Sequence, residues 1–174
     1  PGCYLCPGND RAGGHRNPKY DSTFVFDNDF AALKPETEAI DVDEKGLIVA
    51  RDERGVCRVI CFSPRHDLTL ARMSRAEIRA VIEVWVSQYQ DLGAMPWINY
   101  VQIFENRGSM MGASNPHPHC QIWANASVPN EPAREEASFL AHRERNGSCL
   151  LCEYVALESE AGTRVVAENE CFAV

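Results

Sequence analysis

The clearest pattern of apolar and polar positions lies between residues 74 and 92, where apolar residues recur every three or four positions. This period matches the turn of an α-helix and predicts an amphipathic helix here. Ser74 and Glu77 form a capping box at its start, and Gly93 is placed to end it. A second helix is expected over residues 132–147.

Shorter stretches rich in aromatic and β-branched residues are typical of strands. The acidic stretch 36–44 is expected to be a surface loop. Because strands and helices do not alternate regularly as in a parallel doubly wound sheet, the predicted fold class is α+β, a mainly antiparallel sheet with packed helices. The expected strands cover residues 23–26, 47–49, 56–62, 98–105 and 119–125.

Composition narrows the choice of function. A length of 174 residues is enough for one ordinary core. The formal charge of -8, with Lys and Arg unclustered, argues against a nucleic-acid platform. Apolar runs stay well short of the roughly 18 residues that span a bilayer, and a secretory signal pattern is absent. We expect a soluble protein that binds neither nucleic acid nor membrane.

Four of the eight cysteines form two Cys-x-x-Cys pairs, Cys3/Cys6 and Cys149/Cys152. In a chain with a sufficient core, this spacing favours metal ligands in a reduced, cytoplasmic protein over a disulfide scaffold. The other four lie in apolar surroundings and are expected to be buried, inert thiols: Cys57, Cys61, Cys120 and Cys171.

The most informative segment is residues 117–123, because an extended backbone places His117, His119 and Gln121 on one face. Two imidazoles facing a pocket suit nucleophilic catalysis at phosphorus. The small residues 112–115 nearby supply backbone amides that can approach a phosphate. Without that context, polar residues at a strand edge or a metal pair would be the better interpretation.

Cys3 and Cys6 have the spacing of zinc ligands, but a second close pair does not follow at zinc-finger distance. The remaining ligands must come from distant segments, and His66 and His117 are the candidates. The alternative is a thiol pair that holds no metal.

These residues together resemble the galactose-1-phosphate uridylyltransferase family, a branch of the histidine triad superfamily in which glutamine, here Gln121, replaces the last histidine of the triad. The resemblance covers essentially the whole chain and implies a histidine-triad-like fold. Its motifs are Cys-x-x-Cys-x-Gly-Asn at 3–9, Asn-Asp-Phe-Ala-Ala-Leu at 28–33, Arg-Val-Ile-Cys-Phe-Ser-Pro at 58–64, Phe-Glu-Asn-Arg-Gly at 104–108, Ser-Asn-Pro-His-Pro-His-x-Gln at 114–121 and Pro-Asn-Glu-x-x-Arg-Glu at 129–135.

The resemblance implies a ping-pong exchange in galactose metabolism, the Leloir pathway. UDP-glucose would uridylylate His119 and release glucose 1-phosphate, and galactose 1-phosphate would then take the uridylyl group to give UDP-galactose. The family also implies a homodimer.

The same resemblance assigns roles to other residues. Zinc would be held by Cys3, Cys6, His66 and His117, and the main-chain carbonyl of His117 would orient the His119 ring. Gln121 and Ser114 would contact phosphoryl groups, whereas Asn28, Asp29, Asn106 and Gly112 would line the uridine and phosphate site.

Glu135 matches a ligand of a second metal site, iron or zinc, whose histidines come from later in the family's chain. By itself it would be a solvent-facing residue near a helix start, and both interpretations stay open. Ala113 departs from the family, because a cysteine commonly precedes the matching serine.

The sequence is expected to be the N-terminal part of a longer chain that supplies upstream arginines and a C-terminal half. We divide it into a domain at 1–147 and the start of a truncated second histidine-triad-like repeat at 148–174, where the second Cys-x-x-Cys pair stands ahead of strand-like residues. Chance recurrence of so short a pattern is an equal alternative.

Two other functions remain open. One is a related adenylyl-transferring enzyme, such as an ADP-glucose phosphorylase, which would use the same histidine. The other is a zinc-stabilised nucleotide-binding module without turnover. The segment 28–33 favours uridine.

Overall fold

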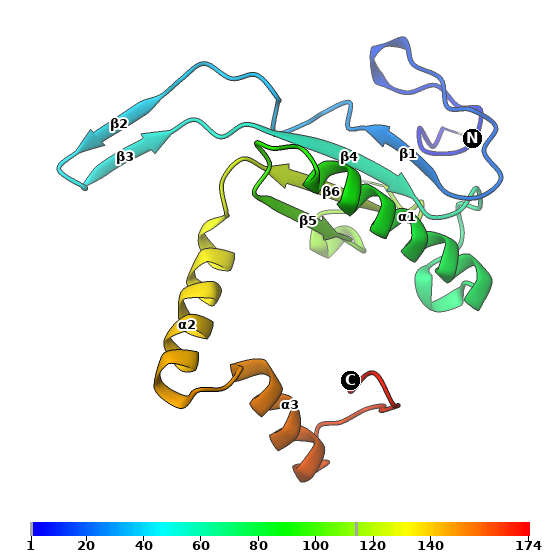
Figure 1. The fold of residues 1–174 in the computed structure, drawn as a ribbon. Coiled ribbons are helices and arrows are strands. Elements are labelled where there is room, and N and C mark those ends of the chain that lie inside the picture. The colour runs from blue at the N-terminus through cyan, green and yellow to red at the C-terminus, as the bar shows by residue number, and fades with distance from the viewer. Residues whose placement is uncertain (1, 114) are drawn as a thin grey trace. The chain divides into compact units, whose positions relative to one another are not determined.

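The computed structural model describes residues 2–113 and 115–174. It contains two compact units, residues 1–127 and residues 128–174. The first unit contains a four-stranded antiparallel sheet in the order β1-β4-β6-β5, a separate hairpin, and a long helix (Figure 1). Its elements are β1 (Phe24–Asp27), β2 (Asp41–Glu44), β3 (Ile48–Arg51), β4 (Gly55–Cys61), α1 (Arg75–Gly93), β5 (Tyr100–Phe104) and β6 (His119–Asn125), with short 3-10 helices at Ala12–Gly14, Leu70–Arg72 and Ser109–Met111.

The predicted α+β class is confirmed, and β6 has the expected bounds. Its pairing with β4 places His119 opposite Cys61 and Gln121 opposite Val59. Because successive side chains of a strand point to opposite faces, His119 and Gln121 share one face of the sheet. Cys120, which lies between them on β6, faces the other way.

Helix α1 packs against the face of the sheet opposite to His119. The predicted capping box at Ser74 and Glu77 is present, with hydrogen bonds in both directions. Val81 and Leu92 of α1 are fully buried in the main apolar core. Their partners in this core include Ile60, Cys120, Ile122 and Ala124 of the sheet and Phe62 directly after β4.

The N-terminal segment covers the face that carries His119. Leu5, which lies between Cys3 and Cys6, is buried in a second core with Val59 and Cys61. Tyr20 and residues of β1 pack around this core. The predicted metal-binding loop is thereby held against the strands that carry the candidate nucleophile.

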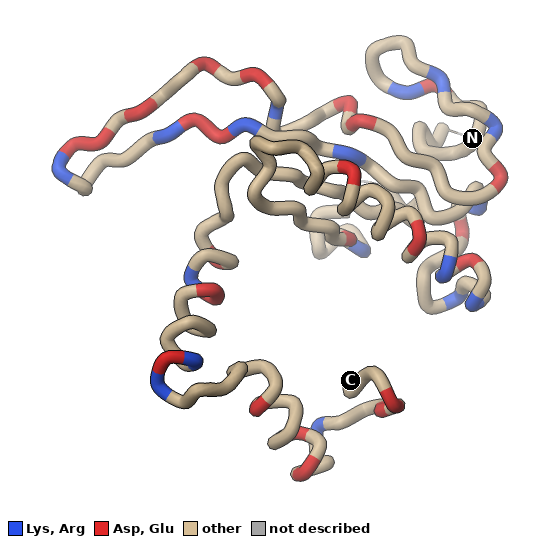
Figure 2. Tube along the Cα trace, viewed as in Figure 1, with Lys and Arg blue, Asp and Glu red and all other residues tan. Residues whose placement is uncertain are grey.

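The prediction of a surface loop at 36–44 was wrong for its last part, because Asp41–Glu44 forms β2 and pairs with β3. The turn between them uses left-handed backbone at Lys45 and Gly46, and the Gly46 amide donates to the Asp43 carboxylate at 2.7 Å. All residues of both strands are exposed, so the pairing buries no apolar face that the sequence pattern could reveal. Figure 2 shows the acidic residues along β2 and the segment before it.

The second unit contains α2 (Asn130–Asn146) and α3 (Leu150–Ala161). Helix α2 ends close to the predicted position, with Gly147 in left-handed conformation directly after it, and begins two residues before Pro132. The residues after Cys149 form α3 where strand-like residues were expected. Cys57, Cys61 and Cys120 are buried as expected, whereas Cys171 is exposed. Among the described residues, no helix has the length and apolar character needed to cross a membrane.

Gly55, at the start of β4, has no room for a side chain. A Cβ atom there would overlap the main-chain oxygen of Ala124 and lie 2.8 Å from Cδ1 of Leu33. We expect Gly55→Ala to lower the free energy of unfolding by about 1–3 kcal/mol in urea titrations, because the paired strands must move apart. Gly93→Ala is the matched control, since a Cβ there meets no atom within 4 Å. Equal stability of the two variants would contradict this close approach.

Candidate functional site

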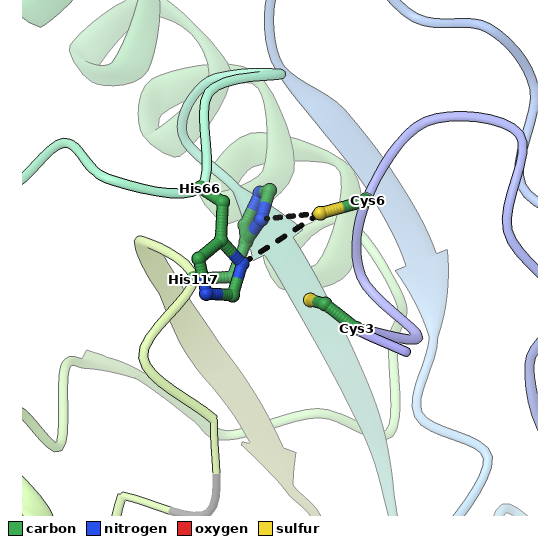
Figure 3. Close-up of side chains that lie close together, drawn as sticks. All are labelled: Cys3, Cys6, His66 and His117. Carbon is green, nitrogen blue, oxygen red and sulfur yellow. Dashed lines mark hydrogen bonds between the residues drawn. The ribbon is translucent and has the colours of Figure 1, made fainter. Parts of the chain in front are cut away.

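Four side chains from three separate segments form one cluster in the first unit. Cys3 and Cys6 come from the N-terminal loop, His66 from the segment after β4, and His117 from the residues just before β6 (Figure 3). One potential ligand atom from each lies within 4.8 Å of all the others. The structure thus brings together the four predicted zinc ligands, and the cluster could hold a metal ion.

The distances within the cluster test whether zinc would fit. The Sγ atom of Cys6 lies 3.6 Å from Nδ1 of His66 and 3.5 Å from Nδ1 of His117. Zinc–sulfur bonds of about 2.3 Å and zinc–nitrogen bonds of about 2.0 Å, at tetrahedral angles, separate sulfur from nitrogen by roughly 3.5 Å. The donor set of two thiols and two imidazoles therefore matches a closed, tetrahedral zinc site.

His117 is the buried member of the cluster, with 1% of its surface exposed. Burial lowers its pKa to about 4, and the neighbouring His66 and His119 add to this effect. Its Nε2 atom lies 2.9 Å from the main-chain oxygen of Ser63, which can only accept, so Nε2 carries the proton. The lone pair of Nδ1 is then free to face Cys6 and a metal.

Asn115 forms contacts with two members of the cluster, Cys3 and His117. Its side-chain oxygen accepts from the main-chain amide of His117 at 2.9 Å and lies 3.4 Å from Sγ of Cys3. Asn115 is buried, with 7% of its surface exposed. It was not among the predicted site residues, although it stands inside the Ser-Asn-Pro-His motif, a local signal that was available.

His119 is held by the residue two positions before it. Its Nδ1 atom lies 2.7 Å from the main-chain oxygen of His117. Because a carbonyl oxygen accepts only, Nδ1 carries the proton and Nε2 keeps its lone pair. The metal cluster and the candidate nucleophile are therefore joined through a single residue, His117, whose ring belongs to the cluster and whose carbonyl fixes the His119 ring.

A pocket opens beside His119 on the same face of the sheet. It brings His119 together with three predicted substrate-binding residues, Asn28, Asp29 and Gln121. The other lining residues are Tyr4, Leu5, Phe26, Phe30 and Val59, which the sequence did not single out as binding residues. Phe30 is 77% exposed and offers aromatic surface to a ligand, whereas the ring of Phe26 in β1 packs against the guanidinium of Arg11.

A second hollow is also lined by His119 and includes Asn106 together with Arg107, Gly108 and Ala113. Gly112 ends the 3-10 helix before it, with left-handed backbone at φ 81°. Ser114 lies outside the described residues. Glu135 is an exposed residue of α2, in the second unit, and is not part of the metal-ligand cluster among the described residues.

Comparisons with known proteins agree with one another. The family model for the N-terminal domain of galactose-1-phosphate uridyl transferase matches residues 1–129. The galactose-1-phosphate uridylyltransferases of Rattus norvegicus and Haemophilus influenzae are 48% and 47% identical over 98% of this chain, which covers 44% and 48% of their lengths. The Saccharomyces cerevisiae enzyme is 42% identical over the whole chain, which covers 51% of it. The chain thus spans about half the length of these relatives.

Solved structures show the same fold. A uridylyltransferase structure superposes on 97% of this chain with a TM-score of 0.78 at 24% identity, and the match covers 52% of that protein. An ADP-glucose phosphorylase from Arabidopsis thaliana superposes on 98% with a TM-score of 0.72 at 23% identity, and the match covers 54% of it. At this identity the likeness establishes the fold alone.

Proposed function

Because the chain belongs to the galactose-1-phosphate uridylyltransferase family, we propose that it carries the nucleophile of an enzyme that moves UMP between UDP-glucose and galactose 1-phosphate. The observation that carries this proposal is the position of His119. Its Nδ1 proton is engaged by the His117 carbonyl at 2.7 Å, and its ring lines a pocket with aromatic and polar walls. The remaining nitrogen, Nε2, is the attacking atom.

In the first half-reaction, Nε2 of His119 attacks the α-phosphorus of UDP-glucose. A nitrogen–phosphorus bond forms and the bond to the bridging oxygen breaks, so glucose 1-phosphate leaves with that electron pair. The imidazole becomes positively charged, and its Nδ1–H donates more strongly to the His117 carbonyl. A phosphate oxygen of galactose 1-phosphate then attacks, which releases UDP-galactose and restores His119.

Other residues of the pocket would bind the substrate. Asn28 and Asp29 supply polar groups to the uridine, and the exposed ring of Phe30 is available for stacking on its base. Gln121 lies two residues after His119 on the same face of β6. It would contact the phosphoryl oxygens together with Ser114. Asn106 and Gly112 would line the part of the site that holds the phosphates.

Zinc would be held by Cys3, Cys6, His66 and His117, whose sulfur–nitrogen distances support this assignment. When bound, the ion would supply a structural link and keep two ligand thiols deprotonated. The ion would not take part in the reaction itself. His119 contacts the main-chain oxygen of His117, whereas the ring nitrogen of His117 would bind the ion. Thiolate ligands also support a reducing, cytoplasmic location.

We further propose three features of the whole protein, two of which the family implies. These are a homodimer and a second metal site with Glu135 as one ligand of iron or zinc, to which the recurring Cys-x-x-Cys pair adds a second histidine-triad-like repeat beginning at 148–174. The assigned pathway would be galactose metabolism.

The shared fold with an ADP-glucose phosphorylase makes adenylyl transfer the second candidate. We expect the complete protein to retain label from UDP-glucose labelled at its α-phosphorus, in an acid-labile and base-stable bond. Unlabelled galactose 1-phosphate should discharge it as UDP-galactose. ADP-glucose labelled in the same way is the parallel substrate.

The outcomes separate the candidates. Label from ADP-glucose alone would replace the uridylyl assignment with the adenylyl one. Tight nucleotide binding with no retained label from either substrate would instead identify a non-catalytic, zinc-stabilised module.

A further inference from the structure

The hydroxyl of Tyr20 lies where three parts of the site meet. Its Oη atom is 2.6 Å from the main-chain oxygen of Leu5, in the loop between Cys3 and Cys6. The same atom is 3.1 Å from Nε2 of His117. The ring of Tyr20 stacks on Phe24 of β1, with ring centroids 5.1 Å apart. One hydroxyl therefore contacts both the Cys3-x-x-Cys6 loop and the segment that leads into β6 and His119.

The direction of these hydrogen bonds follows from the atoms involved. A hydroxyl has one proton, and the Leu5 carbonyl can only accept, so Tyr20 donates to Leu5. Toward His117 the hydroxyl must accept, and Nε2 of His117 is the donor. The main-chain oxygen of Ser63, 2.9 Å away, accepts from the same N–H. Two acceptors thus fix the Nε2–H tautomer and leave Nδ1 unprotonated, 3.5 Å from Sγ of Cys6.

We propose that Tyr20 is a positioning residue for the metal centre and, through His117, for His119. Its hydroxyl keeps Nδ1 of His117 toward Sγ of Cys6, where both would hold the ion, and ties the Cys3-x-x-Cys6 loop to the His117 ring. Partners of this kind hold the ring orientation and basicity of a metal-binding histidine, and their removal costs about 10–100-fold in metal affinity or activity. The effect on His119 rests on the proposed function, whereas the effect on metal binding does not.

Tyr20→Phe tests this role, because it removes only the hydroxyl and keeps the ring on Phe24. We expect the dissociation constant for zinc, measured by competition with a chromogenic chelator, to rise about 10–100-fold. Tyr89→Phe is the matched control, since Tyr89 is an exposed residue of α1 outside the site. It should bind zinc as the unchanged protein does.

A purely structural role would lower the unfolding temperature of Tyr20→Phe and leave its zinc affinity at 25 °C within twofold of the control. That result would overturn the proposal. If the variant folds only with zinc, the rate of zinc release into excess chelator replaces the affinity. Release about 10–100-fold faster than from Tyr89→Phe supports the proposal, and release at the same rate overturns it.

A second measurement separates this inference from the proposed function. In the complete protein, the rate of label transfer from UDP-glucose should fall in Tyr20→Phe while KM changes little, because the residue does not line the substrate pocket. If Tyr20→Phe binds zinc more weakly and the unchanged complete protein also forms no adduct, the role of Tyr20 in metal binding is supported and uridylyl transfer is rejected.

Discussion

We expect the replacement of His119 by asparagine in the complete protein to abolish the covalent adduct with UDP-glucose and to lower turnover by on the order of 10⁴-fold or more. The adduct requires a nitrogen with a free lone pair at the α-phosphorus, and Nε2 of His119 is the atom that the His117 carbonyl leaves in this state. An asparagine amide has no such lone pair. The measurement is retention of label from UDP-glucose labelled at its α-phosphorus, together with steady-state turnover.

The fold and the metal content should survive this substitution. His119 is half-buried and lies outside the metal-ligand cluster, so His119→Asn should keep its zinc and its unfolding temperature. Its dissociation constant for UDP-glucose should change only a few-fold, because most of the pocket lining remains. His15→Asn, at an exposed histidine, is the matched control and should be labelled normally. An adduct that persists in His119→Asn would place the nucleophile elsewhere.

The sequence predicted the elements best where local pattern and local chemistry coincide. The capping box of α1 and the apolar alternation of β6 are read from neighbouring residues, and both elements were confirmed. The strand β2 was missed because its acidic residues are exposed on both faces and show no apolar alternation. The turn residues Lys45 and Gly46 were the remaining sequence signal of the hairpin. Helix α3 was missed because Leu150–Ala161 has many exposed apolar residues and no clear polar face.

The candidate site was also predicted best where its residues are close in the sequence. Cys-x-x-Cys spacing predicted Cys3 and Cys6 as metal ligands directly, whereas His66 and His117 were chosen from the histidines of distant segments, because their approach to Cys6 depends on how β4 and β6 pair. Asn115 and Tyr20 were missed. Tyr20 meets His117 across 97 residues of sequence, and hydrogen bonds between such distant positions leave no periodic signal.

Cys6→Ser should release one equivalent of zinc and strongly destabilise the first unit. Cys6 is the cluster member whose sulfur contacts both imidazoles, at 3.5 and 3.6 Å, and a serine hydroxyl does not replace a thiolate at zinc. Structural zinc binding contributes on the order of 10 kcal/mol to folding in small domains. Even partial loss of this contribution should lower the unfolding temperature by about 10 °C or more. Metal analysis per chain and thermal unfolding are the measurements.

The destabilisation is expected to act through the metal, and chelation distinguishes this cause from a local packing defect. A strong chelator should lower the unfolding temperature of the unchanged protein to that of Cys6→Ser and should not lower the variant further. Cys171→Ser is the matched control, because Cys171 is exposed and lies in the second unit. It should keep its zinc and its unfolding temperature. If Cys6→Ser bound as much zinc as Cys171→Ser, the cluster would not be the metal site, and the link from Cys6 through His117 to His119 would need no ion to hold it.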